Sequence, residues 1–432
     1  MKKVAFCTLG CKVNHYETEA MAELFKSRGY TIGDFNAPAD IYIINTCTVT
    51  SISDRKSRQM IRRAGKQNPG AVICVTGCYA QTAPEAVSAI EGVDLVVGTN
   101  ERSRIVDLVE SLIPGDTKTV VPDIMHIHEF EPLHISGYSE LTRAYVKIQE
   151  GCNQFCSYCI IPYARGPIRS RQPADVLAEA TTLAENGFSE IVFSGIHVAS
   201  YGLDLGDISL AGLLSAANEI SGLRRIRLSS IEPMTLNDTF IAKIRGCTKL
   251  CHHFHLSLQS GCDETLRRMN RKYTTAQYLS IVEGLRRNYS DVAVTTDIMV
   301  GFPGETEAEF ADTIKFIEAV HFADAHIFQY SPRTGTPAAK YTNQVSPQIK
   351  EQRSKVITQI IQRHRREFLE GFIGQTMEVL FERSCGQGMF EGKTGNYITV
   401  IVQTPYDLSG KFRLVRLADI REDKVYGEIV AE

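Results

Sequence analysis

Hydrophobic and polar positions follow two alternating patterns through the first quarter of the chain. Short apolar runs are each followed by a stretch with helical spacing, as in Asn14–Arg28, where large apolar residues recur every three or four positions. A chain that alternates between strands and helices in this way favours a parallel α/β sheet. The apolar runs predict buried strands at Lys3–Leu9, Ile41–Asn45, Ala71–Thr76 and Asp94–Gly98.

A longer series of the same kind fills the middle of the chain. Helical segments such as Pro173–Glu185 and Glu307–Val320 separate six apolar runs. Repeated βα units of about 30 residues or more predict a barrel of the TIM type, here partial, with six units instead of eight. The predicted barrel strands are residues 142–149, 190–194, 224–229, 252–258, 292–298 and 324–330.

The last part of the chain has a third pattern of hydrophobic and polar positions. Residues 346–370 have the spacing of a charged amphipathic helix, and after Gly371 short alternating strands are separated by glycine turns. This pattern is typical of a small all-β barrel. We interpret residues 112–140 as a linker, and expect three domains at 1–137, 138–370 and 371–432. The predicted strands of the last domain are Met377–Glu382, Tyr397–Val402, Phe412–Leu417 and Lys424–Ile429.

Composition narrows the class of protein. The 432 residues include 47 Lys and Arg against 50 Asp and Glu, and this net charge of −3 excludes a wholly basic nucleic-acid binder but not a local basic surface. No run of 18 apolar residues occurs, so we expect no membrane-spanning helix. The apolar stretch Val4–Leu9 before Cys11 is shorter than the ~7–15 residues of a signal-peptide core, and we expect a cytoplasmic protein.

Twelve cysteines in a reducing compartment indicate metal binding or catalysis rather than disulfides. Cys152, Cys156 and Cys159 directly follow the first predicted barrel strand. Three thiolates so close together can hold three irons of a [4Fe–4S] cluster and leave the fourth iron open. A structural zinc site would need a closed set of four ligands, and no second Cys or His pair follows nearby.

A second set of cysteines follows the first three predicted strands. Cys11, Cys47 and Cys78 each lie just beyond a strand end, and loops at the carboxyl ends of parallel strands open on the same side of a sheet. We therefore expect these three side chains to converge. Cys7 and Cys74 instead lie inside apolar runs, where a buried cysteine acts as a small hydrophobic residue more often than as a ligand.

We call Cys152, Cys156 and Cys159 the barrel triplet. Their spacing resembles the CxxxCxφC motif of the radical S-adenosylmethionine superfamily, with Tyr158 at the aromatic position. Further stretches extend the resemblance over essentially the whole chain, to the methylthiotransferase family with its C-terminal TRAM domain. The matching stretches are Gly10–Asn14, Asn45–Val49, Gly77–Gln81, Ile161–Gly166, Ser229–Pro233, Leu258–Gly261 and Gly301–Glu305.

This resemblance implies an enzyme, a transferase with two [4Fe–4S] clusters and S-adenosylmethionine. One cluster would be bound by Cys152, Cys156 and Cys159, and a second, which delivers sulfur, by Cys11, Cys47 and Cys78. Inserting a methylthio group at an unactivated carbon needs a radical, a sulfur source and a methyl donor, which ordinary side chains do not supply. The resemblance also implies an electron donor such as a flavodoxin or a ferredoxin, and we expect a monomer.

Candidate residues for S-adenosylmethionine lie at the ends of barrel strands. Ser194 and Gly195 occupy the place where relatives bind the methionyl amino group, and later strand ends offer groups that could reach the ribose or the carboxylate. A purely structural hydrogen bond at a strand end is the alternative for each of them. The full set of expected cofactor-binding residues is Tyr158, Ser194, Gly195, Ser230, Glu232 and Gln259.

Basic residues gather in four groups: 55–66, 165–171, 267–272 and the helix 346–370. Such groups are often only solvated faces, yet four of them in an acidic chain favour a track for RNA phosphates. The last domain has more acidic than basic residues, so aromatic contacts would have to help there. The expected RNA-binding residues are Arg55, Arg58, Arg62, Arg63, Arg165 and Arg169.

The residues at variable positions of two motifs distinguish the branches of the family. Gly10–Thr18 and Gly151–Cys159 most resemble the branch that adds a methylthio group to C2 of N6-threonylcarbamoyladenosine, next to the tRNA anticodon. The alternatives are an enzyme for isopentenyl adenosine in tRNA or for a ribosomal-protein aspartate, and, in a different class, a non-catalytic Fe–S redox sensor that binds RNA. We interpret the cysteines and histidines at 247–255 as core residues and the P-loop-like segment 388–394 as a β-turn.

Overall fold

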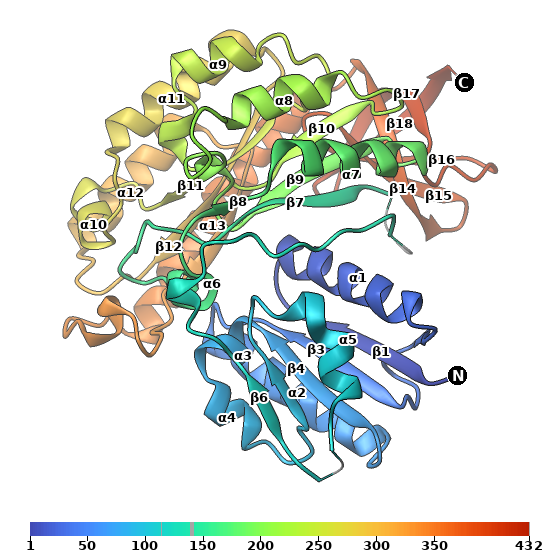
Figure 1. The fold of residues 1–432 in the computed structure, drawn as a ribbon. Coiled ribbons are helices and arrows are strands. Elements are labelled where there is room, and N and C mark those ends of the chain that lie inside the picture. Colours follow the sequence, from blue (N-terminus) through green and yellow to red (C-terminus); the bar gives the residue numbers. More distant parts are fainter. Residues whose placement is uncertain (114, 139–141, 432) are drawn as a thin grey trace.

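The computed structural model describes residues 1–113, 115–138 and 142–431. Figure 1 shows a parallel sheet with helices on both faces, a larger strand-and-helix barrel beside it, and a small all-β barrel at the end of the chain. The predicted fold class is therefore confirmed.

All six strands of the N-terminal sheet run parallel, in the order β2-β1-β3-β4-β5-β6. Apolar side chains of α1 and α5 cover one face, and those of α2, α3 and α4 cover the other. The strands are β1 (Lys3–Thr8), β2 (Thr31–Gly33), β3 (Ile41–Thr46), β4 (Val72–Gly77), β5 (Leu95–Val97) and β6 (Lys118–Val120), and the helices are α1 (Lys12–Ser27), α2 (Ser51–Gln67), α3 (Cys78–Thr82), α4 (Pro84–Ser88) and α5 (Ile105–Glu110).

Four of these strands were predicted from the sequence, and the two edge strands were not. β2 and β6 have three residues each and are largely exposed, so they lack the continuous apolar run that marks the equally short but buried β5. The pattern indicated the segment 112–140 as a linker. Within the described part of that segment, Lys118–Val120 instead form the edge strand β6, which corrects this prediction.

The central domain has the six parallel strands that the spacing predicted. β7, β9 and β10 form one sheet, β11, β12 and β13 another, and two isolated bridges between Ile226–Leu250 and Ile231–Leu256 connect them. A short strand, β8 (Arg169–Ser170), pairs antiparallel with β7. The six are β7 (Ala144–Glu150), β9 (Glu190–Gly195), β10 (Arg225–Leu228), β11 (His253–Gln259), β12 (Ala293–Val300) and β13 (Asp324–Gln329).

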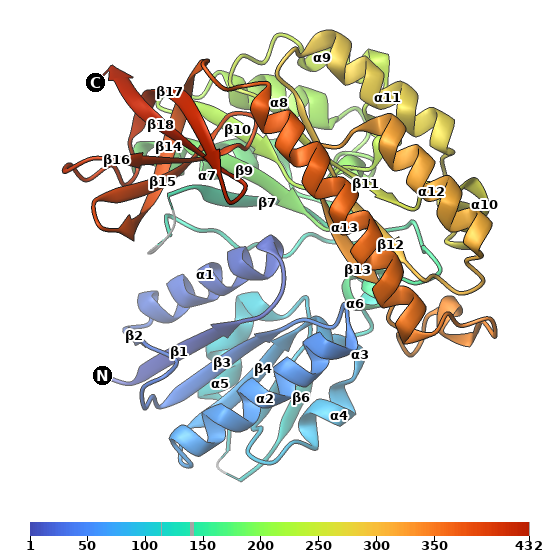
Figure 2. The same ribbon diagram turned by 180° about the vertical axis from the view of Figure 1, so that it is seen from behind.

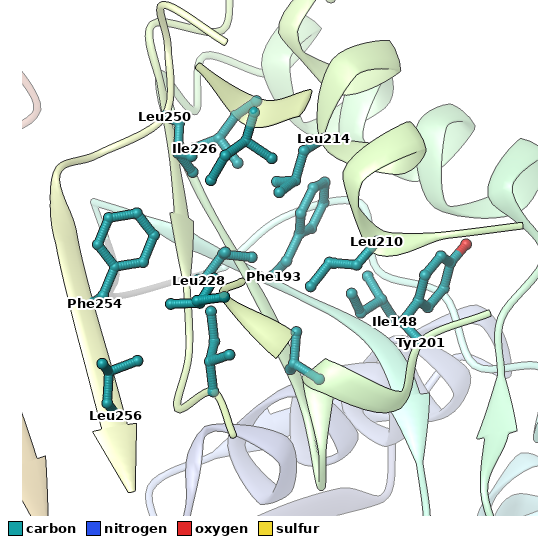
Figure 3. Close-up of a cluster of buried hydrophobic side chains, with 14 of the residues drawn as sticks. Ile148, Phe193, Tyr201, Leu210, Leu214, Ile226, Leu228, Leu250, Phe254 and Leu256 are labelled. Carbon is teal, nitrogen blue, oxygen red and sulfur yellow. The ribbon is translucent and has the colours of Figure 1, made fainter. Parts of the chain in front are cut away.

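Helices cover the outside of this barrel. Two of them, α7 (Pro173–Glu185) and α12 (Glu307–Val320), have the predicted bounds, and both have clear start signals: proline in the first turn of α7 and a Thr306–Glu309 capping box on α12. Large apolar side chains fill the space between strands and helices (Figure 3). The remaining helices are α6 (Ile161–Arg165), α8 (Leu210–Asn218), α9 (Asp238–Ile244), α10 (Asp263–Arg268) and α11 (Thr275–Asn288).

The long helix α13 (Pro347–Glu370) crosses the back of the barrel and leads into the last domain (Figure 2). This is a closed barrel in the order β14-β15-β16-β18-β17. It has five strands where four were expected, because residues 389–394 form a strand and only Gln387 and Gly388 form the turn. The strands are β14 (Thr376–Gly386), β15 (Met389–Thr394), β16 (Thr399–Gln403), β17 (Phe412–Arg421) and β18 (Lys424–Ala431).

Candidate active site

The barrel triplet lies on the loop between β7 and α6, at the carboxyl end of the first barrel strand. The backbone N–H of Cys159 donates to the carbonyl of Cys156 at 2.9 Å, which turns the loop back on itself. Burial raises the pKa of the Cys152 thiol to about 11 and that of Cys159 to about 12. In such surroundings a thiol stays neutral unless a positive partner, such as a metal, stabilises the thiolate.

A cavity of about 390 Å³ opens beside this triplet, and the ends of the barrel strands line it. Three of the expected cofactor-binding residues lie in its wall: Tyr158, Glu232 and Gln259. Its other polar lining residues include His197, Arg271 and Asp297, which the sequence did not indicate as cofactor-binding residues. We call this space the barrel cavity.

The remaining expected cofactor-binding residues are not part of that lining. Ser194 is buried, and its hydroxyl lies 3.4 Å from the Val146 carbonyl as a donor, which is the structural alternative at a strand end. Ser230 is exposed, and Gly195 packs against the backbone of Gln149. The backbone around Gly195 stays near the cavity, since Ile196 and His197 line it.

Arg271 is the main charge beside the barrel triplet. Its guanidinium donates to the Cys156 sulfur at 3.3 Å and to the Glu232 carboxylate at 2.8 Å. The same guanidinium lies 5.0 Å from the centre of the Tyr273 ring. A residue that the sequence grouped with possible phosphate-binding cations is thus a buried partner of the cysteine loop.

The second set of cysteines, Cys11, Cys47 and Cys78, which we call the N-terminal triplet, comes from three separate strand ends. Thr46 and Gly77 are paired in the sheet, so Cys47 and Cys78 follow neighbouring positions of β3 and β4. A Cβ at Gly10, which has a φ of +117°, would lie 3.0 Å from the Cys47 Cβ, so glycine is needed for Cys11 to approach. Desolvation raises the pKa of all three thiols, although Cys11 as a residue is exposed, and repulsion from a neighbouring thiolate of the triplet raises it further. The predicted convergence is therefore present.

The two cysteine triplets lie at the same junction between the N-terminal domain and the barrel. Val49 and Thr50, two and three residues after Cys47, line the barrel cavity together with Cys152 and Cys159. At a second point of the junction, Arg165 from α6 donates through Nε to the Cys78 sulfur at 3.2 Å. The loop after Cys47 and the Cys78 side chain thus both contact the barrel.

A buried group of charges surrounds Arg165. Its guanidinium pairs with Glu17 of α1 at 2.5 Å and with Glu150 of β7 at 3.2 Å, and Arg102 and Lys147 pair with the same two carboxylates. Burial alone would raise the pKa of Glu17, but these cations hold it far below its usual range. The N-terminal domain and the barrel thus share one ion network directly behind Cys78.

The expected role of Arg165 and Arg169 in RNA binding needs correction. Arg165 has 0% of its surface exposed and Arg169 has 1%, so neither side chain reaches an outer surface. The Arg169 guanidinium donates to the carbonyls of Ile127 and Arg165. Sequence position could not reveal this, because the carboxylates that surround Arg165 come from distant segments.

The basic helix α2 behaves differently from the other basic groups. Within the described residues, none of its basic side chains pairs with a carboxylate, and Arg55, Arg62, Arg63 and Lys66 are exposed. A hollow of about 650 Å³ runs along them, and Arg58 donates to the Tyr79 hydroxyl at 3.2 Å. In contrast, cations of the other groups are paired: Arg267 with Glu264, Arg268 with Glu309, Arg353 with Glu305, Arg363 with Glu318 and Arg365 with Asp324.

The cysteines and histidines at 247–255 are structural, as expected. His252 pairs with Asp291 at 2.6 Å, and His253 stacks on Tyr397 with ring centres 4.5 Å apart. Across the described ranges, no group of three or more His, Cys, Asp or Glu residues is arranged to hold a single metal ion. In the same ranges, no helix is both long and apolar enough to cross a membrane.

Comparison with known proteins agrees with this fold and site. A family model described as the radical SAM superfamily matches residues 146–317, and one described as uncharacterized protein family UPF0004 matches residues 3–98. Among solved structures, the radical S-adenosylmethionine methyltransferase TsrM from Kitasatospora setae is similar in fold, with a TM-score of 0.58, 14% identity, and coverage of 78% of this chain and 77% of that one. The fold is thus that of a radical SAM protein.

Relatives with higher identity narrow the family. The threonylcarbamoyladenosine tRNA methylthiotransferase MtaB of Bacillus subtilis is 44% identical, over 96% of this chain and 94% of its own length. The tRNA-2-methylthio-N(6)-dimethylallyladenosine synthase of Acetivibrio thermocellus is 37% identical, over 99% and 92%. The chain therefore belongs to the radical SAM methylthiotransferases.

Proposed function

We propose that this enzyme adds a methylthio group to C2 of N6-threonylcarbamoyladenosine in tRNA. The observation that carries the proposal is the meeting of two cysteine triplets at one junction, where the loop after Cys47 enters the barrel cavity. Relatives named for this substrate, from Bacillus subtilis, Aquifex aeolicus and Thermotoga maritima, share 44%, 38% and 36% identity with the chain.

The donor sets suit two [4Fe–4S] clusters. Each site offers three thiols and one buried arginine that donates to a sulfur, and hydrogen bonds to cluster sulfurs are a common way of tuning such groups. Cys152, Cys156 and Cys159 would hold one cluster, and Cys11, Cys47 and Cys78 the other. Together with S-adenosylmethionine, the clusters supply the radical, the sulfur and the methyl group that side chains lack.

The residues of the chain itself bind and orient. Glu232, Gln259 and Asp297 present oxygen and nitrogen atoms in the wall of the barrel cavity, where the ribose and the methionyl group of the cosubstrate need partners. The Tyr158 side chain offers an aromatic surface in the same wall. A redox sensor without substrate would have no need for a cavity with several polar side chains beside the triplet, so we favour catalysis.

We assign tRNA binding to α2, whose exposed cations pair with no carboxylate of the described residues and suit a phosphate backbone. Arg55, Arg58, Arg62 and Arg63 keep their expected role in this proposal. Arg165 and Arg169 do not. The electron donor, such as a flavodoxin or a ferredoxin, and the monomeric state remain predictions.

The test is mass spectrometry of tRNA nucleosides from a strain without this gene and from the same strain with it restored. The methylthio derivative of threonylcarbamoyladenosine should vanish and return, and the gene carrying Cys152→Ala should not restore it. A change in the methylthio derivative of isopentenyl adenosine instead would replace the proposed substrate by the alternative one. No change in any tRNA nucleoside would leave the ribosomal-protein aspartate as the substrate to examine.

A further inference from the structure

Phe155, inside the barrel triplet, has an unusual backbone. Its φ is +46°, a left-handed conformation that bulky residues avoid. The Asn270 side chain donates to the Phe155 carbonyl at 2.9 Å, and the Ser157 N–H donates to the Met269 carbonyl at 3.0 Å. The surrounding structure thus holds the loop in this conformation, and strain retained next to an active site points to a use.

The use that this conformation serves is exposure of an aromatic ring. The Phe155 residue is 39% exposed although its neighbour Cys156 is buried. Its ring meets that of Tyr163 on α6, with centres 5.9 Å apart and planes at 73°. Tyr163 is itself 40% exposed, so the pair shows a substantial aromatic surface to solvent. Together, we call Phe155 and Tyr163 the aromatic pair.

The aromatic pair borders a second hollow at the domain junction. This junction cavity, of about 720 Å³, is lined by Tyr163 and by polar groups of both domains, including Thr48, Gln81 and Arg333. It shares Ile160 with the barrel cavity, and its residue Asp54 belongs to the first turn of α2. The sequence of sites along the surface is therefore the cationic helix, the junction cavity with the aromatic pair, and the barrel cavity.

We propose that the aromatic pair is a stacking platform for the nucleobase next to the modified adenosine, and that the junction cavity receives this base. The proposal rests on the proposed function and deepens it. Proteins read unpaired loops of RNA by splaying the bases out and stacking them on aromatic side chains. The exposed cations of α2 would hold the phosphates on one side, while the target base enters the barrel cavity on the other.

The experiment uses the reconstituted enzyme and anticodon stem-loop RNAs that carry threonylcarbamoyladenosine. A fluorescent 2-aminopurine replaces the base on the 5′ side of the target in one RNA and on the 3′ side in another. Stacking quenches this fluorophore, so binding to the unaltered enzyme should quench one of the two probes. Phe155→Leu and Tyr163→Leu remove the ring but keep an apolar side chain, and each should weaken binding roughly 10-fold and abolish most of the quenching.

Matched variants separate stacking from other causes. Phe155→Tyr keeps a ring and should restore both quenching and affinity. Ile113→Ala alters an apolar side chain that is 67% exposed on the N-terminal domain and lines none of the three cavities, and it should change neither. The iron content of each variant, measured before binding, shows whether the cysteine loop is still loaded.

The outcomes distinguish the two proposals. If the unaltered enzyme binds the RNA while both leucine variants, loaded with iron, bind and quench equally well, the platform is wrong and the proposed function stands. If quenching is absent with the unaltered enzyme although it binds, the platform is also wrong. If the unaltered enzyme does not bind the RNA at all, the proposed function itself fails.

Discussion

The two cysteine triplets have similar surroundings, but the chain brings their cysteines together in different ways. The barrel triplet occupies one loop, Cys152–Cys159, which a hydrogen bond between Cys159 and Cys156 turns back and which Met269 and Asn270 of the same domain hold. The N-terminal triplet is spread over three loops and depends on the pairing of β3 with β4 and on the close approach at Gly10. The first site is a property of a short segment, and the second is a property of a folded sheet.

The arginines beside the triplets differ in the same sense. Arg271 takes its partners, Cys156 and Glu232, from the barrel alone. Arg165 belongs to the barrel but contacts Cys78 and Glu17 of the N-terminal domain. The environment of the N-terminal triplet therefore exists only when the two domains are docked. This difference predicts that the N-terminal site is the more easily disturbed of the two.

The largest expected effect comes from removing each triplet in turn. With two four-iron clusters, the intact protein should bind about eight irons, and alanine at Cys152, Cys156 and Cys159 should leave about four and abolish all cleavage of S-adenosylmethionine. Alanine at Cys11, Cys47 and Cys78 should also leave about four irons, yet spare formation of 5′-deoxyadenosine and stop methylthiolation. Iron analysis and chromatography of both products measure this. Normal methylthiolation by a Cys47→Ala protein would remove the second cluster from the reaction.

The next effect concerns the ion network between the domains. Arg165→Gln leaves the buried carboxylates of Glu17 and Glu150 short of one cation, and breaking a buried ion pair costs about 3–5 kcal/mol. We expect a lower melting temperature and loss of iron from the N-terminal site before the barrel site. Arg363→Gln, which breaks an exposed pair with Glu318, is the control and should leave both unchanged. Equal melting temperatures for the two variants would contradict the network.

A smaller effect tests the close approach at the N-terminal triplet. Gly10→Ala strains a left-handed backbone, by about 1–3 kcal/mol, and also pushes a methyl group against Cys47. Gly29→Ala strains a similar backbone, with a φ of +82°, but its methyl group meets nothing within 4 Å. Both variants should lose stability in urea unfolding, whereas iron loading should fall only in Gly10→Ala. Equal iron content in the two would show that the approach at Gly10 does not shape the site.

The smallest expected effect comes from changing the basic surface of α2, which leaves both cysteine triplets intact. Replacing Arg58, Arg62 and Arg63 with alanine should weaken tRNA binding and flatten its dependence on salt, by up to about 2 in the slope of log affinity against log salt for three lost contacts. Iron content should not change. Binding curves at several salt concentrations measure the slope, and replacing the paired Arg363, Arg365 and Arg366 of α13 is the control. Identical slopes for both triple variants would remove α2 from the RNA path.

Local pattern by itself determined much of this protein. The barrel strands β7 to β13, except the two-residue β8, and helices such as α7 and α12 were predictable, because burial of one face imposes a period on consecutive residues. The short edge strands β2 and β6 were missed, since they are largely exposed and have no apolar run, unlike the equally short β5. The barrel triplet was also predictable, because its three thiols share one loop.

Only the tertiary structure decided what each charge does. Counting basic residues placed Arg165, Arg169 and Arg271 on possible RNA surfaces, whereas the fold buries all three. Their partners include Glu17 and Glu150, which approach Arg165 only after two domains dock. In the same way, His197 and Asp297 can be recognised as cavity residues only in the folded barrel, which brings distant segments of the chain together. Periodicity records which face of a segment is buried, but a charge pairs across space with residues whose sequence positions carry no trace of it.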